Sequence, residues 1–223
     1  MQIHLLYFYS HYKMTFPQFT HQLITGIQGT SALEYIGTFT GIASVWYSRK
    51  ENILVYPVGL VSTVIYIYIS IKGNLFGEAS VNIYYTIMSF YGWYLWAKKD
   101  TTNHQNVLHI SSSTKKEWIQ QLLFFAVCYV VIFVCLVWLK NTFLKDTIPW
   151  ADAFASATAY TAMWLMAKKK LENWVWWIVT NAASMPLYFI KGYAFTSIQF
   201  LVFFAMAVAG FIEWKRKIKY AAT

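Results

Sequence analysis

The chain has 223 residues, of which 58% are hydrophobic, 20% are aromatic and only 12% are charged. Soluble domains carry roughly 25% charged residues, so this composition excludes an ordinary soluble enzyme and is typical of a polytopic membrane protein. The net charge of +9 does not indicate a nucleic-acid partner, because the basic residues form short clusters between apolar runs, as signals of membrane topology do.

Residues 1–30 precede the first long apolar run and contain scattered aromatic residues and three histidines. They lack the basic start and the apolar core of about 7–15 residues that a cleaved signal peptide needs. We therefore expect an N-terminal segment that lies in the membrane interface.

Seven apolar runs that are long enough to cross a bilayer follow this segment. They cover residues 31–47, 53–71, 80–97, 118–139, 150–167, 173–190 and 197–214. The sequence therefore predicts an all-α integral membrane protein with seven transmembrane helices.

The basic residues divide unevenly between the two sides of these runs. The connections after the first, third, fifth and seventh runs carry 13 lysines and arginines, and the opposite side carries 5. Because basic residues accumulate on the cytoplasmic side, we expect the C-terminus in the cytoplasm and the N-terminus outside.

An internal repeat appears when the chain is compared with itself at a shift of 118 residues. The shift aligns Glu34 with Asp152 and Trp46 with Trp164, and a basic cluster follows each tryptophan. Two three-helix units of the same orientation need an odd number of spans between them, and the run 118–139 supplies one. The prediction is two parallel three-helix repeats joined by a linker helix, a 3+1+3 plan.

This plan divides the chain into four parts. They are an N-terminal interfacial segment at 1–30, a first three-helix repeat at 31–97, a cytoplasmic loop plus linker helix at 98–149, and a second three-helix repeat with the basic C-terminus at 150–223. Beyond the basic clusters, the pair Glu51-Asn52 matches Glu172-Asn173, which predicts that the shift between the repeats changes to 121 in this loop.

The run 173–190 carries the first candidate binding residues. Trp174, Trp177 and Asn181 are spaced by three and four, so a helix places them on one face. Asn181 lies nine residues after Glu172, which is roughly 13 Å into a hydrocarbon core of about 30 Å. Because an amide at that depth is costly in lipid, we expect it to face the protein interior. The alternative for Trp174 is the aromatic belt at the membrane interface.

The run 80–97 offers a companion face at the same helical spacing. It presents Asn82, Tyr85, Ser89, Trp93 and Trp96. Tryptophan and tyrosine rings can stack on a flat heteroaromatic group, and amides can bond its polar atoms. Gln199, near the outer end of the last run, could reach the same cavity or lie in the interface.

Glu34 and Asp152 lie at the outer starts of two predicted helices. One interpretation is a helix-start carboxylate that interacts with the positive end of the helix dipole. The other is an outward vestibule in which two equivalent acids attract a cation.

Several kinds of chemistry lack their residues. All five histidines lie outside the apolar runs, and no phosphate-binding loop or nucleophile motif occurs. We therefore expect no enzymatic activity, no metal site and no cofactor.

The motif Trp174-x-x-Trp177-x-x-x-Asn181, with Tyr91-Gly92-Trp93-Tyr94-Leu95-Trp96, resembles the Pnu family of vitamin transporters, in particular its PnuC-type nicotinamide riboside transporters. The resemblance covers residues 30–217. It implies a bacterial inner-membrane homotrimer related in plan to the SWEET sugar transporters. It also implies facilitated diffusion of a phosphate-free vitamin that a cytoplasmic kinase then traps. Trp174, Trp177 and Asn181 would contact the ligand, and Trp93 and Trp96 would do so more weakly.

The choice of vitamin depends on the groups around the ring. Nicotinamide riboside and thiamine both carry a cationic heteroaromatic ring, which aromatic side chains attract. A carboxamide matches the amides of Asn181 and Gln199, whereas an aminopyrimidine prefers a carboxylate. The sequence therefore favours nicotinamide riboside over thiamine, riboflavin or a sugar, and the absence of basic residues from the middle of the runs disfavours a phosphorylated substrate.

Overall fold

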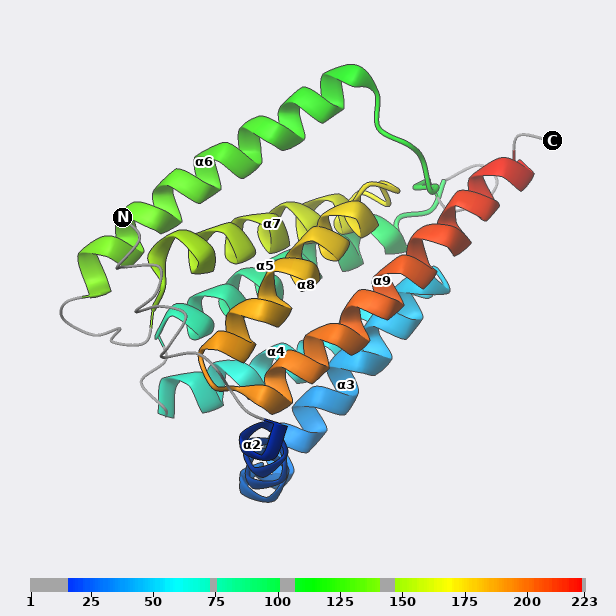
Figure 1. The fold of residues 1–223 in the computed structure, drawn as a ribbon. Helices are drawn as coiled ribbons and strands as arrows, with labels where there is room; N and C mark the ends of the chain where they lie inside the picture. The colour runs from blue at the N-terminus through cyan, green and yellow to red at the C-terminus, as the bar shows by residue number, and fades with distance from the viewer. Residues whose placement is uncertain (1–15, 73–75, 101–106, 141–146, 222–223) are drawn as a thin grey trace.

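The computed structural model describes residues 16–72, 76–100, 107–140 and 147–221, and these parts fold as helices without a strand (Figure 1). The helices are α2 (Phe16–Gly29), α3 (Ala32–Arg49), α4 (Val55–Lys72), α5 (Phe76–Ala97), α6 (Lys115–Lys140), α7 (Pro149–Ala167), α8 (Asn173–Ile190) and α9 (Ala194–Ala221). The all-α class is confirmed for this part of the chain. The largest difference from the predicted ranges is at α9, which continues as a helix through the basic C-terminal residues.

The helices begin where local capping residues satisfy free backbone N–H groups. At α3 the Ser31 hydroxyl accepts from the Glu34 N–H at 3.2 Å, and the Glu34 carboxylate accepts from the Ser31 N–H at 2.7 Å. Thr114 and Glu117 make the same reciprocal pair at the start of α6. α7 begins with Pro149, which needs no N–H partner at that position.

Six helices pack in a closed ring. α3 packs on α4, α4 on α5, α5 on α7, α7 on α8, α8 on α9, and α9 returns to α3. α6 lies outside the ring against α7, and α2 packs against α9 (Figure 1). The ring therefore has an interior that side chains of all six helices can reach.

Within the part of the chain that the structure describes, three helices are long and apolar enough to cross a membrane by length and composition, namely α4, α6 and α9. α6 has the highest mean hydropathy of the three, and no residue in its most apolar 18-residue stretch is buried inside the protein. Its exposed apolar surface, which includes Trp138 at 79% exposed, suits contact with lipid chains.

The helix α2 lies within the segment 1–30 for which an interfacial position was predicted. Residues 1–15 of that segment lie outside the described residues. The interfacial position of α2 remains a prediction.

The main hydrophobic core lies at the end of the ring where α3, α5, α7 and α9 end and α4 and α8 begin. We call this the basic end, because the basic clusters of the sequence follow these helix ends. Its buried residues are Val55, Tyr56, Trp96, Met163, Met166, Leu171, Trp174, Ala207 and Trp214.

Candidate functional site

The aromatic core of the basic end repeats itself at a constant shift of 118 residues. The rings of Tyr56 and Trp96 meet edge to face with centroids 5.2 Å apart, and those of Trp174 and Trp214 do so at 5.5 Å. Each residue of the first pair lies 118 positions before its counterpart in the second. The two halves of the ring therefore share one local arrangement here.

Two glycines make this arrangement possible. A Cβ atom at Gly92 would lie 2.4 Å from the Tyr56 hydroxyl, and one at Gly210 would lie 2.6 Å from the Trp174 ring. These distances are far below van der Waals contact, so both positions require glycine for the close approach of ring and helix. The two glycines are also 118 positions apart.

The two core tryptophans each cap a helix of the opposite half. Trp96 Nε1 donates to the Met166 carbonyl at the end of α7 at 3.3 Å. Trp214 Nε1 donates to the Ser48 carbonyl at the end of α3 at 3.2 Å. Each of these carbonyls also accepts a backbone N–H three residues on, from Lys169 and Glu51 respectively, so the indole N–H adds a second bond at the helix end. Acceptors and donors are again 118 apart.

An ion pair joins two equivalent residues just beyond α3 and α7. Glu51 and Lys169, 118 positions apart, both adopt left-handed backbone angles, with φ of 60° and 50°. Lys169 Nζ lies 2.8 Å from Glu51 Oε1. Left-handed conformations are costly for residues other than glycine, so the surrounding contacts must hold them.

This geometry corrects the predicted alignment of the loop. The shift stays at 118, and Glu51 is equivalent to Lys169 rather than to Glu172. Glu172 instead accepts from the Ser113 N–H at 2.9 Å and from its hydroxyl at 2.6 Å. The Glu-Asn pairs matched in sequence but are not equivalent in the structure, because the two repeats share backbone positions and ring contacts in this loop rather than charges.

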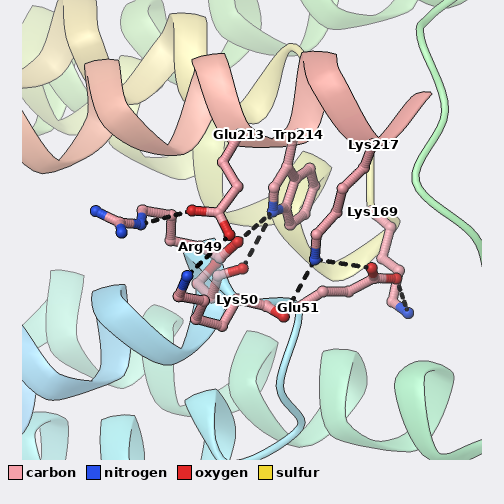
Figure 2. A network of polar contacts seen from close by, with 8 residues as sticks. Arg49, Lys50, Glu51, Lys169, Glu213, Trp214 and Lys217 are labelled. Carbon is pink, nitrogen blue, oxygen red and sulfur yellow. Dashed lines mark hydrogen bonds and ion pairs between the residues drawn. The ribbon is translucent and has the colours of Figure 1, made fainter. Parts of the chain in front are cut away.

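Further polar contacts connect the same end (Figure 2). Glu213 lies 2.8 Å from Arg49 Nε and 3.3 Å from Lys50 Nζ, and Lys217 Nζ lies 3.4 Å from Glu51 Oε2. These contacts all run between α9 and the end of α3. The basic end is therefore closed by both packing and charge.

Two predicted site residues, Trp174 and Trp96, belong to this closed core. Trp174 is 1% exposed and Trp96 is 3% exposed. The Trp174 ring lies against Trp214 and the Gly210 backbone, and the Trp96 ring lies near Tyr56, Trp214 and the Lys169 ammonium. In this arrangement both rings serve packing, and their contact with a ligand remains a prediction.

The middle of the ring brings together three other predicted site residues. The rings of Trp177 on α8 and Tyr85 on α5 lie 6.0 Å apart at an interplanar angle of 62°. Asn181 lies one turn further along α8 and is 4% exposed, and no hydrogen bond from the described residues reaches its amide. An aromatic pair with a buried, unbonded amide beside it can accept a flat ring with a polar substituent.

A carboxylate that the sequence analysis missed borders this site on the side away from the basic end. The Tyr188 hydroxyl of α8 donates to Glu78 Oε1 of α5 at 3.5 Å. Glu78 precedes Asn82 and Tyr85 by four and seven residues, a spacing that places all three on one face of a helix and could have identified Glu78 from the sequence. Asn181 thus lies between the Trp177–Tyr85 pair and the Tyr188–Glu78 pair.

The remaining predicted binding residues are placed less centrally. Asn82 Nδ2 donates to the Glu78 carbonyl of its own helix at 3.0 Å. Gln199 is half-buried near the start of α9. Trp93 is 37% exposed and does not belong to the core at the basic end.

The two acids proposed for a vestibule have local partners. Glu34 completes the capping box of α3. Asp152 accepts from the Ile148 N–H at 2.7 Å and pairs with Lys191 at 2.6 Å. These contacts account for both acids as helix-start residues, and a vestibule role remains a hypothesis.

A surface groove of about 620 Å³ lies at the basic end rather than beside Trp177. It is lined by Ser112, Leu171, Phe211, Ile212, Lys215, Arg216, Ile218 and Lys219. The groove is therefore separate from the aromatic pair in the middle of the ring.

Comparisons with known proteins agree on one family. The family model described as nicotinamide mononucleotide transporter matches residues 31–216. The nicotinamide riboside transporter PnuC of Escherichia coli strain K12 is 22% identical over 210 residues, which cover 82% of this chain and 85% of that protein. PnuC of Neisseria mucosa is 28% identical over 199 residues, covering 85% of this chain and 74% of its own.

A relative with another substrate also matches. The riboflavin/roseoflavin transporter RibM of Streptomyces davaonensis is 22% identical over 181 residues, covering 81% of this chain and 83% of RibM. Among solved structures, the crystal structure of the vitamin B3 transporter PnuC superposes with a TM-score of 0.69 at 23% identity, covering 91% of this chain and 89% of that one.

Proposed function

Because the chain belongs to the nicotinamide mononucleotide transporter family, and is thus a membrane transporter rather than an enzyme, we propose that its substrate is a phosphate-free vitamin, nicotinamide riboside. Transport would be facilitated diffusion across a bacterial inner membrane. A cytoplasmic kinase would phosphorylate the product and so make uptake one-way. No cofactor and no nucleic acid take part.

The observation that carries this proposal is the Trp177–Tyr85 pair beside the unbonded amide of Asn181. The cationic nicotinamide ring would lie against the aromatic faces through cation–π attraction. Its carboxamide would bond Asn181, with Gln199 as a second amide within the same ring of helices. Asn82 and Trp93 would contribute at the edge of the site.

The charge distribution argues against the mononucleotide in the family's description. The residues 76–97, 149–167 and 173–190, which form α5, α7 and α8, contain no lysine or arginine. A phosphate in the middle of the ring would lack a charged partner, which is costly away from water. The riboside, which has no phosphate, avoids this cost.

The proposed architecture is the 3+1+3 plan with seven spans. The constant shift of 118 between α3–α5 and α7–α9 supports it, and α6 outside the ring would be the linker helix. The basic end would face the cytoplasm, with the C-terminus, and the N-terminus would lie outside. The assembly would be a homotrimer, which the mass of the detergent-solubilised protein can test.

Riboflavin is the competing substrate that a specific observation favours, since RibM is among the relatives. Thiamine is the second competitor, because it too is a cationic heteroaromatic compound and its aminopyrimidine could bond the Glu78 carboxylate that borders the site. A sugar, as in carriers of the SWEET plan, is the third, and it would need neither stacking nor the cation–π contact.

The test uses purified protein in proteoliposomes that contain a nicotinamide riboside kinase and ATP. Labelled nicotinamide riboside should accumulate, and excess riboflavin, thiamine or hexose should compete weakly. Binding of nicotinamide riboside without any flux would contradict its transport by this protein. Strong competition by riboflavin, thiamine or hexose would make that solute the better candidate for the substrate.

The Trp177→Ala variant tests the site itself. It should lose about 1–3 kcal/mol of binding free energy for nicotinamide riboside, the range for stacking of a base on an aromatic side chain. Trp138→Ala is the matched control, because the same substitution is made at a ring that is 79% exposed on α6. Equal affinities of the two variants in calorimetric titration would remove Trp177 from the site.

A further inference from the structure

The two halves of the ring meet through a pair of equivalent residues at the basic end. Glu51 follows α3 and Lys169 follows α7, and their charged groups are 2.8 Å apart (Figure 2). The Lys169 side chain is 3% exposed, and its Nζ also lies 4.7 Å from the centroid of the Trp96 ring. A buried ammonium of this kind depends on its carboxylate partner, since an isolated charge is costly away from water.

We propose that Glu51 and Lys169 form a closing pair, which holds the basic end shut and has to separate each time a solute passes to that side. The proposal rests on the transport activity proposed above. Equivalent positions of two repeats can touch only where the repeats face each other. A movement of one half against the other therefore changes the Glu51–Lys169 distance directly.

The closed end also contains features that oppose closure. The Tyr56 hydroxyl and Trp174 Nε1, at equivalent positions, are buried without a hydrogen-bond partner in the described parts of the chain. Glu51 and Lys169 themselves hold left-handed backbone angles. Buried unsatisfied groups and such angles raise the free energy of the closed state. The charge pair offsets this, so the loss of one charge should shift the equilibrium toward the open end.

Thiol labelling tests the closing pair without any substrate. Ser89 is 3% exposed on α5, between Tyr85 of the middle and Trp96 of the basic end. With the native Cys128 and Cys135 replaced by serine, Ser89→Cys supplies a single buried thiol. In vesicles whose basic end faces the reagent, Glu51→Gln should speed labelling by a charged maleimide about tenfold, because the open state becomes more populated.

The matched control removes another carboxylate at the same end. Glu117 of α6 pairs with Lys170 at 2.7 Å, but α6 lies outside the ring. Glu117→Gln should leave the labelling rate of Ser89→Cys unchanged. If both carboxylate variants label at the starting rate, or if both speed it equally, the closing pair is refuted.

Cross-linking tests whether the pair must separate. Glu51→Cys combined with Lys169→Cys allows a short bis-methanethiosulfonate reagent to join the halves. The joined protein should lose uptake at least about tenfold relative to the same protein before the reagent and recover it after reduction, while each single cysteine variant should take up substrate equally fast with and without the reagent. Full uptake by the joined protein would overturn the proposal.

The two readouts separate this proposal from the choice of substrate. If nicotinamide riboside is not taken up by any variant, the proposed function fails, while faster labelling of Glu51→Gln still supports the closing pair. If uptake is normal but labelling does not change, the substrate stands and the closing pair fails.

Discussion

The basic end and the middle of the ring differ in how closely the two halves repeat each other. At the basic end, Tyr56 and Trp96 have aromatic counterparts with the same contacts. In the middle, the residues 118 positions before Trp177 and Asn181 are Gly59 and Thr63, which have quite different side chains.

The difference extends to hydrogen bonding. Thr63 accepts from the Thr86 hydroxyl of α5 at 2.9 Å, whereas the amide of Asn181 is left without a bond from the described residues. Identical residues suit a contact that joins two equivalent halves. A ligand with two unlike ends needs different residues around each end. The symmetric region thus maintains the architecture, and the proposed binding site lies in the asymmetric region.

The largest expected effect compares two tryptophans that lie three residues apart. Trp174→Ala should lower the free energy of unfolding by about 3–5 kcal/mol, because it removes a fully buried ring from the core. Trp177→Ala should cost clearly less, since its ring is only partly buried. Thermal unfolding in detergent measures both, and equal losses would contradict the division between core and site.

The next effect concerns the glycines of the basic end. Gly92→Ala and Gly210→Ala should each destabilise the protein by about 1–3 kcal/mol, because the new Cβ overlaps a rigid buried ring. The two values should be similar if the halves are equivalent. Gly29→Ala is the control, since nothing lies within 4 Å of its added Cβ. Wild-type stability of either core variant would show that the two halves do not pack equivalently at the basic end.

A third prediction compares equivalent polar residues of the middle. Asn181→Leu should lose about 1–3 kcal/mol of binding free energy for nicotinamide riboside, because the ligand carboxamide loses its partner. Thr63→Val should leave the affinity unchanged and lower stability by about 0.5–1.5 kcal/mol through loss of the Thr86 bond. Calorimetric titration measures the affinity of each variant, and thermal unfolding measures its stability. Weaker binding of nicotinamide riboside by the Thr63 variant would add Thr63 to the binding site.

The smallest effect concerns the end of the ring opposite to the basic end. Glu34→Gln removes the charge but keeps a side chain that can complete the capping box, so stability should change by less than about 0.5 kcal/mol. If Glu34 acts only as a helix-start residue, the uptake rate should stay the same as well. A lower uptake rate at low ionic strength that recovers with salt would instead support the vestibule.

The sequence also left some contacts undetected. Glu78 lies two residues before the predicted run 80–97, so that run did not place it on the same helix as Asn82 and Tyr85, although its spacing to both is helical. The pairing of Glu51 with Lys169 was hidden by the matching letters of Glu172-Asn173, since the fold conserves backbone position at this loop and not charge.

The sequence by itself determined the helices, the family and the common face of Trp177 and Asn181, because composition and helical period are local properties. Only the tertiary structure decided what each member of that face contacts. Trp174 shares the spacing of Trp177, but α9 brings Gly210 and Trp214 against it, while α5 brings Tyr85 against Trp177. The role of a ring depends on which neighbouring helix it meets, and that follows from the packing of six helices in a ring rather than from spacing along one.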